Sequence, residues 1–437
     1  MKMRALVVTI WVFINLVFFG MCGYMYLLWS QYWVYLDKGA DSTPSTFDQQ
    51  IYFYNRGYMP NSQNKSKIHE VKSRTKHSTK ENTNVTLVKN SRPRFPNLQT
   101  KDFELDSRKY SCWSNQTKVD CDRKTFQFKD EILKELRRVF TDESNILRMG
   151  QENPYNVRFT GDRGNYMDKS SNELLCELKK VSIHTLRRID IRNHPLSSYI
   201  PKRGLFENKR FNSCAIVASA GGLKGSQLGP FIDSHDLVLR FNHAPTIGFH
   251  DDVGNKTTIR LLNSQVVTKP QFKFLTSKLY QNITIVAWDP SNYTASLDDW
   301  LQKPDFNLFP NYMEFRKRNL KSRLFLMNPK SLWNVWDYIQ SNSPSRLRRN
   351  PPSSGFLGLG ILLPYCNFVD IFEYVPSTRV TKRCHYYDPE ENVACTFGVW
   401  HPLAAEKLLT YQMNIADDKT VFQQGFVRIP GFQNLEC

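Results

Sequence analysis

The chain has 437 residues, of which 59 are lysine or arginine and 41 are aspartate or glutamate, so its formal net charge at pH 7 is +18. This length exceeds what one small core needs, and two domains would be the usual expectation. A net positive charge of this size is compatible with binding to nucleic acid or with attraction of a small anionic substrate. The first residues of the chain decide between these alternatives.

Residues 5–29 form an almost uninterrupted apolar run. Twenty-five helical residues rise about 37 Å, which is enough to cross a bilayer with some tilt. The run continues through Tyr24, Tyr26 and Trp29, a pattern typical of the aromatic belt at a membrane interface. A secretory signal peptide is the alternative, but its apolar core is shorter and ends in a small-residue cleavage site. We therefore expect a transmembrane helix at residues 5–29.

Basic residues flank this run at its N-terminal end. Lys2 and Arg4 precede it, whereas the next basic residue is Lys38. Because cytoplasmic flanks carry the excess of basic residues, we expect residues 1–4 in the cytosol and the rest of the chain in the lumen, as in a type II signal anchor. This topology argues against nucleic acid as a partner, because the lumen contains no such substrate.

The predicted luminal part is rich in cysteines and glycosylation sequons. Of nine cysteines, Cys22 lies in the apolar run, and the eight that follow can form four disulfides in an oxidising compartment. Six Asn-x-Ser/Thr sequons also lie beyond the run and favour the secretory pathway. They begin at Asn64, Asn84, Asn115, Asn255, Asn282 and Asn292.

Residues 30–110 are mostly polar and basic, with few regularly spaced apolar residues, which predicts a flexible luminal stem. Cys112 and Cys121 follow it, nine positions apart, close enough to form a local loop. Asp120 and Asp122 flank Cys121 in a sequence that resembles the metal-binding Asp-x-Asp of enzymes that use nucleotide sugars. This pair precedes every predicted strand of the core, so we expect no metal site there.

Within the globular domain predicted for residues 111–437, short β-branched and apolar segments alternate with longer helical ones from residue 211 onward. This alternation predicts an α/β fold with a doubly wound, mainly parallel sheet. Ligands bind such sheets beyond the carboxyl ends of the strands, at a topological switch point. The predicted strands are 214–219, 237–241, 257–262, 283–288, 323–327 and 368–374, and the predicted helices include 332–339, 355–365 and 401–413.

Polar residues follow three of these strands. Ser219 ends the first and is followed by Gly221 and Gly222, which would let a phosphate or ribose approach, although a simple turn explains them equally well. Asn242 and Asn263 follow the next two strands. Their amides could meet at one crevice, or each could cap the turn or helix that follows it.

Ser353, Ser354 and Gly355 begin a predicted helix. Serine hydroxyls and the free amides of a first helical turn make a natural site for a carboxylate or phosphate. An ordinary capped core helix is the alternative. The glycines favour a functional role, because they cost helix stability and permit close approach.

His401 lies at the start of the last predicted helix. The positive end of the helix dipole disfavours imidazolium, and a neutral imidazole is what a general base requires. A structural histidine is the alternative. Nearby, Cys384 and Cys395 could close a short disulfide loop around His385, whereas the Cys/His spacing of a zinc site is not met.

Taken together, these segments resemble the animal sialyltransferase family, specifically its β-galactoside α-2,6-sialyltransferase branch. A long motif extends over residues 214–265, and a short motif extends over residues 352–370. A third motif is His385-Tyr-Tyr-Asp388, and the last is His401-Pro402 with Glu406. The similarity extends over about residues 176–437.

This resemblance implies an inverting glycosyltransferase with a variant Rossmann-like (GT-A-like) fold, resident in the Golgi membrane with its catalytic domain in the lumen. It would transfer sialic acid from CMP-sialic acid to the 6-hydroxyl of a terminal β-linked galactose, or N-acetylgalactosamine, on glycoprotein N-glycans. The family requires no metal or other cofactor.

The resemblance also implies roles for individual residues. His401 matches the catalytic base. Residues matching donor-binding positions are Ser219, Asn242, Asn263, Ser353, Ser354, Gly355, Cys384, His385, Thr396, Trp400 and Lys407. Residues matching acceptor-binding positions are Gln265, Asp305 and Trp400. The family's disulfides would pair Cys214 with Cys366, Cys384 with Cys395 and Cys176 with Cys437, which leaves Cys112 to pair with Cys121.

Two departures from the family concern the acceptor. Trp400 stands where α-2,6 relatives usually have tyrosine, and His385 replaces a tyrosine that is common in that branch. Galactose and N-acetylgalactosamine therefore both remain open as acceptor sugars. The alternatives to α-2,6 transfer are α-2,3 or α-2,8 linkage, or an inactive relative that binds glycan without turnover. The presence of His401, of both serines and of both asparagines argues against an inactive protein.

Overall fold

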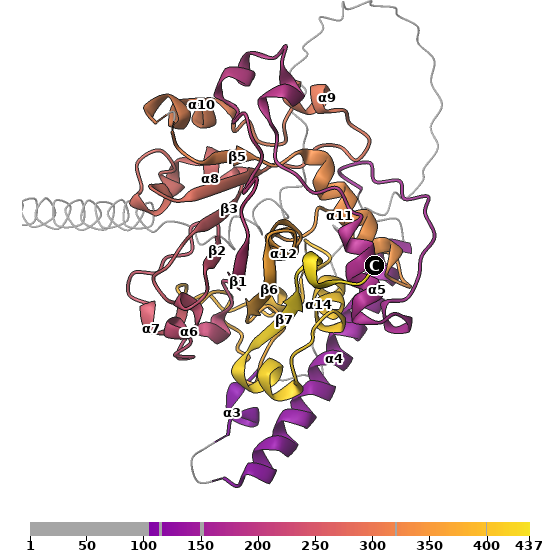
Figure 1. Cartoon of the computed structure of the whole chain (residues 1–437). Helices are drawn as coiled ribbons and strands as arrows, with labels where there is room; N and C mark the ends of the chain where they lie inside the picture. Colours follow the sequence, from indigo (N-terminus) through magenta and orange to yellow (C-terminus); the bar gives the residue numbers. More distant parts are fainter. Residues whose placement is uncertain (1–104, 113–115, 149–152, 320, 399) are drawn as a thin grey trace, which may run out of the picture. The chain divides into compact units, whose positions relative to one another are not determined.

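The computed structural model describes residues 105–112, 116–148, 153–319, 321–398 and 400–437 (Figure 1). The chain divides into residues 1–59 and 60–437, and every described residue belongs to the second unit. The predicted cytoplasmic tail, transmembrane helix and most of the predicted stem lie outside the described residues. Within the described ranges, no helix is both long and apolar enough to cross a membrane.

The folded unit includes residues that the sequence assigned to the stem. Leu105 and Tyr110 are buried, and Ser107–Tyr110 forms helix α3. The phenol of Tyr110 donates a hydrogen bond to Glu131 on the long helix α4, which extends over Lys118–Arg148. Leu105 and Tyr110 therefore pack in the same core as the residues that follow position 111.

A seven-stranded sheet in the order β5-β4-β3-β2-β1-β6-β7 forms the centre of this unit. All neighbouring strands are parallel except β6 and β7, which are antiparallel. The strands are β1 Phe211–Val217, β2 Leu237–Phe241, β3 Ile259–Asn263, β4 Thr284–Trp288, β5 Leu324–Leu326, β6 Cys366–Phe372 and β7 Phe426–Pro430. The predicted α/β fold with a mainly parallel sheet is confirmed, and the six predicted strands all form.

The connection from β5 to β6 creates the switch point. From β1 the chain adds β2, β3, β4 and β5 on one side, and it then returns to place β6 on the other side of β1. The loops that follow β1 and β6 therefore diverge at the carboxyl edge of the sheet, which is where a doubly wound fold binds its ligand.

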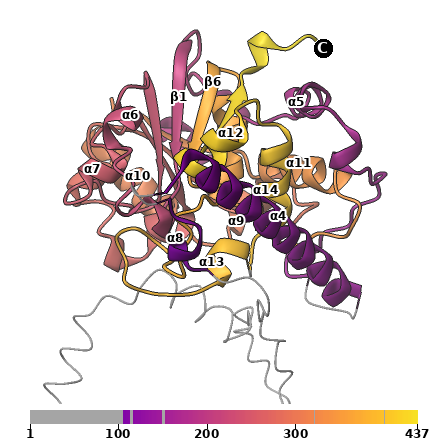
Figure 2. The same ribbon diagram turned by 90° about the horizontal axis from the view of Figure 1, so that it is seen from below.

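Helices cover both faces of the sheet (Figures 1 and 2). Alternate residues of β2 pack on opposite faces: Leu239 joins the core with α12, and Val238 joins the core with α6. Besides α3 and α4, the α-helices are α5 Ser171–Lys179, α6 Gly229–Asp233, α7 His250–Val253, α8 Ser264–Thr268, α9 Leu297–Gln302, α10 Phe309–Arg318, α11 Pro329–Ser341, α12 Ser354–Leu362, α13 Ala394–Phe397 and α14 Leu403–Gln412.

Helix α12 contacts strands β1, β2, β3 and β6. A Cβ atom on Gly358 would lie 3.2 Å from the ring of Phe241, so glycine permits the close contact between this helix and β2. Because α12 is followed directly by the parallel strand β6, its N-terminus lies at the carboxyl edge of the sheet. This packing places the first turn of α12 beside the switch point.

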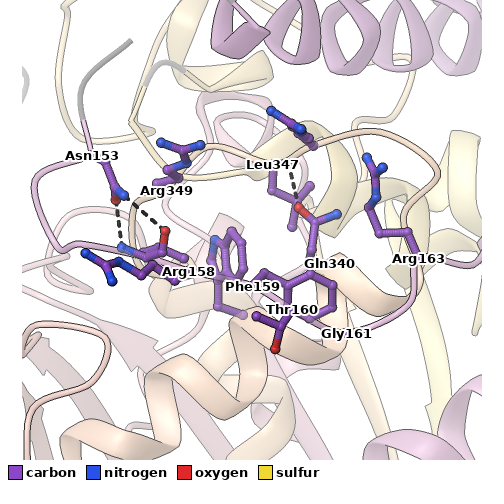
Figure 3. Close-up of a pocket in the computed structure, with 12 residues that line it drawn as sticks. Asn153, Arg158, Phe159, Thr160, Gly161, Arg163, Gln340, Leu347 and Arg349 are labelled. Carbon is purple, nitrogen blue, oxygen red and sulfur yellow. Dashed lines mark hydrogen bonds between the residues drawn. The ribbon is translucent and has the colours of Figure 1, made fainter. Parts of the chain in front are cut away.

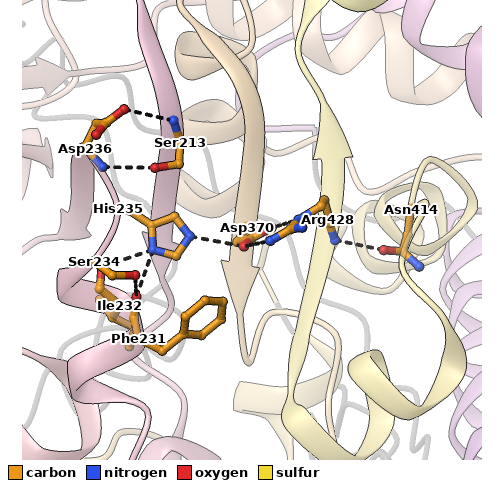
Figure 4. Close-up of polar contacts among 9 residues, drawn as sticks. All are labelled: Ser213, Phe231, Ile232, Ser234, His235, Asp236, Asp370, Asn414 and Arg428. Carbon is orange, nitrogen blue, oxygen red and sulfur yellow. Dashed lines mark hydrogen bonds and ion pairs between the residues drawn. The ribbon is translucent and has the colours of Figure 1, made fainter.

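The antiparallel strand β7, which the sequence analysis missed, is attached through an ion pair with a buried carboxylate (Figure 4). Asp370 on β6 is fully buried and accepts two hydrogen bonds of 2.7 Å from Arg428 on β7. The Nε2 atom of His235 lies 3.1 Å from the same carboxylate. Because a buried carboxylate is costly without partners, these contacts favour pairing of β7 with β6.

The described residues form four disulfides, and they are the expected pairs. The bond between Cys214 and Cys366 joins β1 to β6. The other pairs are Cys112–Cys121, Cys176–Cys437 and Cys384–Cys395. They agree with an oxidising compartment.

Candidate active site

Asn242 and Asn263 meet at the carboxyl ends of β2 and β3. The side-chain oxygen of Asn242 accepts a hydrogen bond of 3.1 Å from the backbone N–H of Asn263. The side-chain oxygen of Asn263 accepts from Val266 and caps α8, so the capping role also holds for this residue. Among the described residues, neither side-chain NH2 group has a hydrogen-bond partner. Both amides can therefore donate to a ligand at this edge.

A buried arginine supports the backbone of Asn242. Asn242 has φ +45°, in the left-handed region. The guanidinium of Arg260 donates to the carbonyl oxygens of Asn242 and Ala244 at 2.9 and 3.0 Å. Burial lowers the pKa of Arg260 from its ordinary value, and its hydrogen bonds keep the loop in one conformation.

The first turn of α12 is held by a buried carboxylate. Glu406 on α14 accepts hydrogen bonds from the backbone N–H and hydroxyl of Ser353, at 2.7 and 2.5 Å. It also accepts one of 2.7 Å from the phenol of Tyr374, which follows β6. Burial raises the pKa of Glu406 above its ordinary value, and these hydrogen bonds oppose the rise. The hydroxyl proton of Ser353 is thus committed to Glu406.

Ser354 and Gly355 are the first two residues of this helix. The hydroxyl oxygen of Ser354 accepts a hydrogen bond of 3.1 Å from the indole of Trp288 at the end of β4, so its own proton can be donated elsewhere. A Cβ atom on Gly355 would lie 2.4 Å from the ring of Tyr374. The backbone N–H groups of the first helical turn have no intrahelical acceptor. This turn therefore offers hydrogen-bond donors of the kind that an anion-binding site requires.

His401 is held by one ring nitrogen. Its Nδ1 lies 2.8 Å from the carbonyl oxygen of Pro351. Because a carbonyl oxygen only accepts, Nδ1 carries the proton and Nε2 is left as an acceptor. Burial lowers the pKa of His401 to about 4, against a smaller opposing effect of the Pro351 carbonyl. The imidazole is therefore neutral near pH 7, as a general base must be.

The reason for this neutrality differs from the one expected. Helix α14 begins at Leu403 and not at His401. The largest cause of the lowered pKa of His401 is removal of the imidazole from water. The helix dipole, which the sequence analysis invoked, is not needed. Trp400 packs edge-on against the imidazole, with ring centroids 4.5 Å apart.

The disulfide loop 384–395 lies against the end of β1. The backbone N–H of Tyr386 donates to the carbonyl oxygen of Ser219 at 3.1 Å, which brings His385 beside the switch point. The ring of His385 stacks on Tyr387 at 5.1 Å, and burial lowers the pKa of His385 to about 4. Its Nδ1 atom has no hydrogen-bond partner among the described residues and lies 4.0 Å from the carboxylate of Asp388. Thr396 lies in the short helix α13 that follows.

Lys407 extends the same cluster from α14. Burial lowers the pKa of its ammonium to about 8, and the carboxylates of Glu373 and Glu406 oppose this change. Its Nζ atom lies 5.9 Å from the ring centroid of Tyr374. Lys407 is thus a cation close to the first turn of α12.

Gln265 and Asp305, the expected acceptor residues, each form a hydrogen bond with a neighbouring side chain, Gln265 with Lys269 and Asp305 with Tyr155. The Nζ atom of Lys269 donates to the side-chain oxygen of Gln265 at 2.8 Å and lies 5.8 Å from the ring centroid of Phe306. Asp305 accepts a hydrogen bond of 3.3 Å from Tyr155. Burial raises the pKa of Asp305 to about 7. The amide of Gln265 and the carboxyl of Asp305 are thus contributed by the segments that follow β3 and β4.

The sequence analysis did not assign site roles to several residues that hold these groups. Pro351 orients the imidazole, Tyr374 and Glu406 hold the first turn of α12, Trp288 holds Ser354, and Tyr155 contacts Asp305. An acidic residue in the apolar helix at 403–412 is a signal that could have identified Glu406. The other four are aromatic or proline residues, whose sequence context resembles ordinary core and turn positions.

Asp120 and Asp122, the other acidic pair that was considered, lie near the start of α4. Asp120 accepts hydrogen bonds from Thr117 and Arg123. Over the described ranges, no group of three or more histidine, cysteine, aspartate or glutamate side chains is arranged to hold a metal ion.

Comparison with known proteins identifies the region that carries this site. The model of glycosyltransferase family 29 (sialyltransferase) matches residues 168–417. Beta-galactoside alpha-2,6-sialyltransferase 2 of Bos taurus is 43% identical over 297 residues, which cover 65% of this chain and 58% of that protein. The Gallus gallus protein of the same name is 44% identical over 293 residues, covering 65% and 54%. The match therefore spans little more than half the length of these relatives.

A solved structure was also found. The crystal structure of a mammalian sialyltransferase aligns with 59% of this chain and 90% of its own, at 20% identity and a TM-score of 0.35.

Proposed function

The chain belongs to glycosyltransferase family 29, the sialyltransferases, and from this premise we propose that it is an inverting β-galactoside α-2,6-sialyltransferase. It transfers sialic acid from CMP-sialic acid to the 6-hydroxyl of a terminal β-linked galactose on a glycoprotein glycan. The observation that carries this proposal is the neutral imidazole of His401, whose Nδ1 is tied to Pro351 and whose Nε2 is left to accept a proton.

His401 acts as the general base. The acceptor hydroxyl attacks the anomeric carbon of sialic acid and transfers its proton to Nε2, while the bond from that carbon to the CMP phosphate breaks. This single displacement inverts the anomeric centre. An imidazole that is neutral before the reaction is ready to take the proton.

The leaving phosphate and the sialic acid carboxylate are both negative. The hydroxyl of Ser354, the first amides of α12 and the ammonium of Lys407 supply donors and positive charge without a metal ion. Ser353 acts through its hydrogen bonds to Glu406, which position the start of α12. His385 and Thr396 bind the phosphate or cytidine side, together with Cys384.

Asn242, Asn263 and Ser219 bind the CMP moiety at the ends of β2, β3 and β1. Gln265 and Asp305 bind hydroxyl groups of the acceptor galactose, and Trp400 provides an apolar wall for donor and acceptor. The indole is an equally good surface for N-acetylgalactosamine, so that sugar is included in the assay below.

The compartment proposed for this reaction is the Golgi lumen, with the chain held by a type II anchor at residues 5–29. The four disulfides, which persist in an oxidising compartment, support a luminal catalytic domain.

The test is a transfer assay with the full chain, expressed in cells that lack sialyltransferase activity and solubilised in detergent. CMP-sialic acid is offered with acceptors that end in Galβ1-4GlcNAc, GalNAcβ1-4GlcNAc or Galβ1-3GalNAc, with and without EDTA. We expect an α-2,6 product, identified by NMR, that forms equally well in EDTA. An α-2,3 or α-2,8 product would correct the linkage, and no transfer to any acceptor would overturn the proposal.

A further inference from the structure

A cavity of about 480 Å³ lies outside the groups assigned to the donor and the acceptor sugar (Figure 3). Its wall comes from residues 153–163, from α11 and from the loop that precedes α12. This volume is within the range of small-molecule sites. None of the proposed donor-binding or acceptor-binding residues lines it.

The lining is strongly basic. Arg158, Arg163, Arg346 and Arg349 contribute to it, whereas none of its twelve lining residues, all of them described, is acidic. Arg163 and Arg349 lie on opposite sides of the cavity in Figure 3. Arginine is the residue best suited to bind carboxylate and sulfate groups, because its planar guanidinium donates two parallel hydrogen bonds.

Three of these guanidinium groups are available. In the part of the chain that the structure describes, Arg158, Arg163 and Arg349 form no side-chain hydrogen bond or ion pair with another residue. Several unpaired cations around one concave surface produce a positive potential that attracts anions.

The cavity wall is fixed by hydrogen bonds. The indole of Trp336 on α11 donates to the carbonyl oxygen of Arg348 at 2.8 Å. The side chain of Gln340 accepts from the backbone N–H of Leu347 at 3.0 Å. These contacts hold the loop that carries Arg349, so the cavity exists before any ligand binds.

The same loop leads directly to the catalytic base. Asn350 and Pro351 follow Arg349 in the chain: Asn350 donates to the carbonyl oxygen of Trp400 at 2.7 Å, and Pro351 holds His401. Two residues span at most about 7 Å, so the Cα atoms of Arg349 and Pro351 lie within that distance.

The opposite wall leads to the acceptor side. Tyr155, three residues before Arg158, donates to the carboxylate of Asp305. Two of the segments that form the cavity wall therefore adjoin residues that contact His401 and Asp305, both of which are proposed to act on the acceptor. The first turn of α12, where the donor anion is expected, contributes no residue to the lining.

We propose that this arginine-lined cavity binds an anionic substituent, a sulfate ester or a carboxylate, on a sugar of the acceptor glycan. It thereby selects acidic glycans over neutral ones. The inference rests on the proposed function, because it assumes that a glycan is the acceptor. Binding at the cavity lowers the KM for the acidic acceptor and leaves kcat unchanged, since the cavity does not include the reacting atoms.

The experiment compares three acceptors: Galβ1-4GlcNAc, the same disaccharide with a 6-O-sulfate on GlcNAc, and the neutral disaccharide attached to an aspartate-rich peptide. The full chain is tested as wild type and as the double variant Arg163→Gln/Arg349→Gln. Arg203→Gln is the matched control, because the side chain of Arg203 is 81% exposed and outside the cavity.

For the wild type at low salt, we expect a KM for the sulfated disaccharide roughly tenfold below that for the neutral one, the ratio that one charge-assisted hydrogen bond supplies. The ratio falls toward one in the double variant and in about 0.5 M salt, but not in Arg203→Gln. An equal KM for both disaccharides, or a ratio that the double variant retains, overturns the proposal. A gain confined to the aspartate-rich glycopeptide also overturns it, in favour of a peptide ligand.

Calorimetric titration of the sulfated disaccharide without CMP-sialic acid separates this inference from the proposed function. Binding by the wild type that is lost in the double variant supports the cavity even if no acceptor is sialylated. Absence of binding, in a protein that does sialylate the neutral disaccharide, rejects the cavity and leaves the proposed function intact. An unchanged melting temperature of the double variant shows that its effect is local.

Discussion

The Nδ1 atom of His401 and the carbonyl oxygen of Pro351 lie 2.8 Å apart, and this contact sets the tautomer of a buried imidazole. Pro351 lies two residues before Ser353, which is the N-cap of α12. The same short segment therefore orients the proposed base and begins the anion site. This contact ties the start of α12 to the segment that precedes α14.

Replacement of His401 by glutamine should abolish most transfer. Glutamine keeps a polar side chain but cannot take up a proton, so we expect kcat to fall at least about 100-fold, with a smaller change in the KM for CMP-sialic acid. Steady-state kinetics measure both constants. His250→Asn is the control, since His250 has a side chain that is 58% exposed. Activity near the wild-type level in His401→Gln would reject the proposed base.

Binding of the acceptor should depend on the ionisation of Asp305. Burial raises the pKa of this carboxyl to about 7, so it is mostly protonated at pH 6 and mostly ionised at pH 8. The ionised form accepts hydrogen bonds from sugar hydroxyls more strongly. We expect the acceptor KM to fall as pH rises from 6 to 8 in the wild type. In Asp305→Asn the KM should be higher and flat over this range, and a parallel decrease in that variant would exclude Asp305 as the cause.

A methyl group at Gly355 should disturb the donor site. A Cβ atom there would lie 2.4 Å from the ring of Tyr374, whose phenol bonds Glu406. We expect Gly355→Ala to destabilise the fold by about 1–3 kcal/mol and to raise the KM for CMP-sialic acid. Thermal melts and donor titrations measure the two effects. The control is Gly204→Ala, because a Cβ at Gly204 has no heavy atom within 4 Å.

Acid should destabilise the folded domain through three half-buried histidines. Burial lowers the pKa of His243, His385 and His401 to about 4, from an ordinary value of 6.5. Between these values the unfolded chain binds more protons, so the free energy of unfolding falls as pH falls from 6.5 to 4. Near pH 5 the three histidines contribute a slope of about 4 kcal/mol per pH unit.

Unfolding measured from pH 7 to pH 4.5 tests this prediction. His243→Phe retains an aromatic ring beside Phe272 and Tyr387. This variant should reduce the slope of the unfolding free energy against pH by about the contribution of one histidine. His250→Asn should leave it unchanged. A slope that is the same in wild type and His243→Phe would contradict the assignment.

The disulfide between β1 and β6 should stabilise the fold more than the disulfide between Cys112 and Cys121, because it closes a longer loop. Cys214 and Cys366 are 152 positions apart, whereas Cys112 and Cys121 are 9 apart. Closing a longer loop restricts the unfolded chain more. Replacing Cys214 and Cys366 by serine should cost about 2–5 kcal/mol, measured by denaturant unfolding. The matched variant without Cys112 and Cys121 should lose less, and an equal loss would contradict the loop-length argument.

The sequence by itself determined the alternation of strands and helices, and with it the mainly parallel sheet, because buried strands and helix caps are local patterns. Asn242, Asn263 and His401 were also identifiable, since their chemistry and their places next to strands or helices are local. Resemblance to a family supplied three of the four disulfide pairs and the remaining assignments, whereas the pair Cys112–Cys121 was inferred from the two cysteines that were left.

Only the tertiary structure decided what holds these groups. Strand β7 contains Arg428 and ends at Pro430, so it does not resemble a buried strand, and its pairing depends on Asp370, 58 positions away. Glu406 meets Ser353 across 53 positions. The low pKa of His401 comes from burial, which depends on packing between distant segments and not on the helix that follows. The arginine cavity likewise combines residues about 180 positions apart, a relationship that no local pattern of charge can predict.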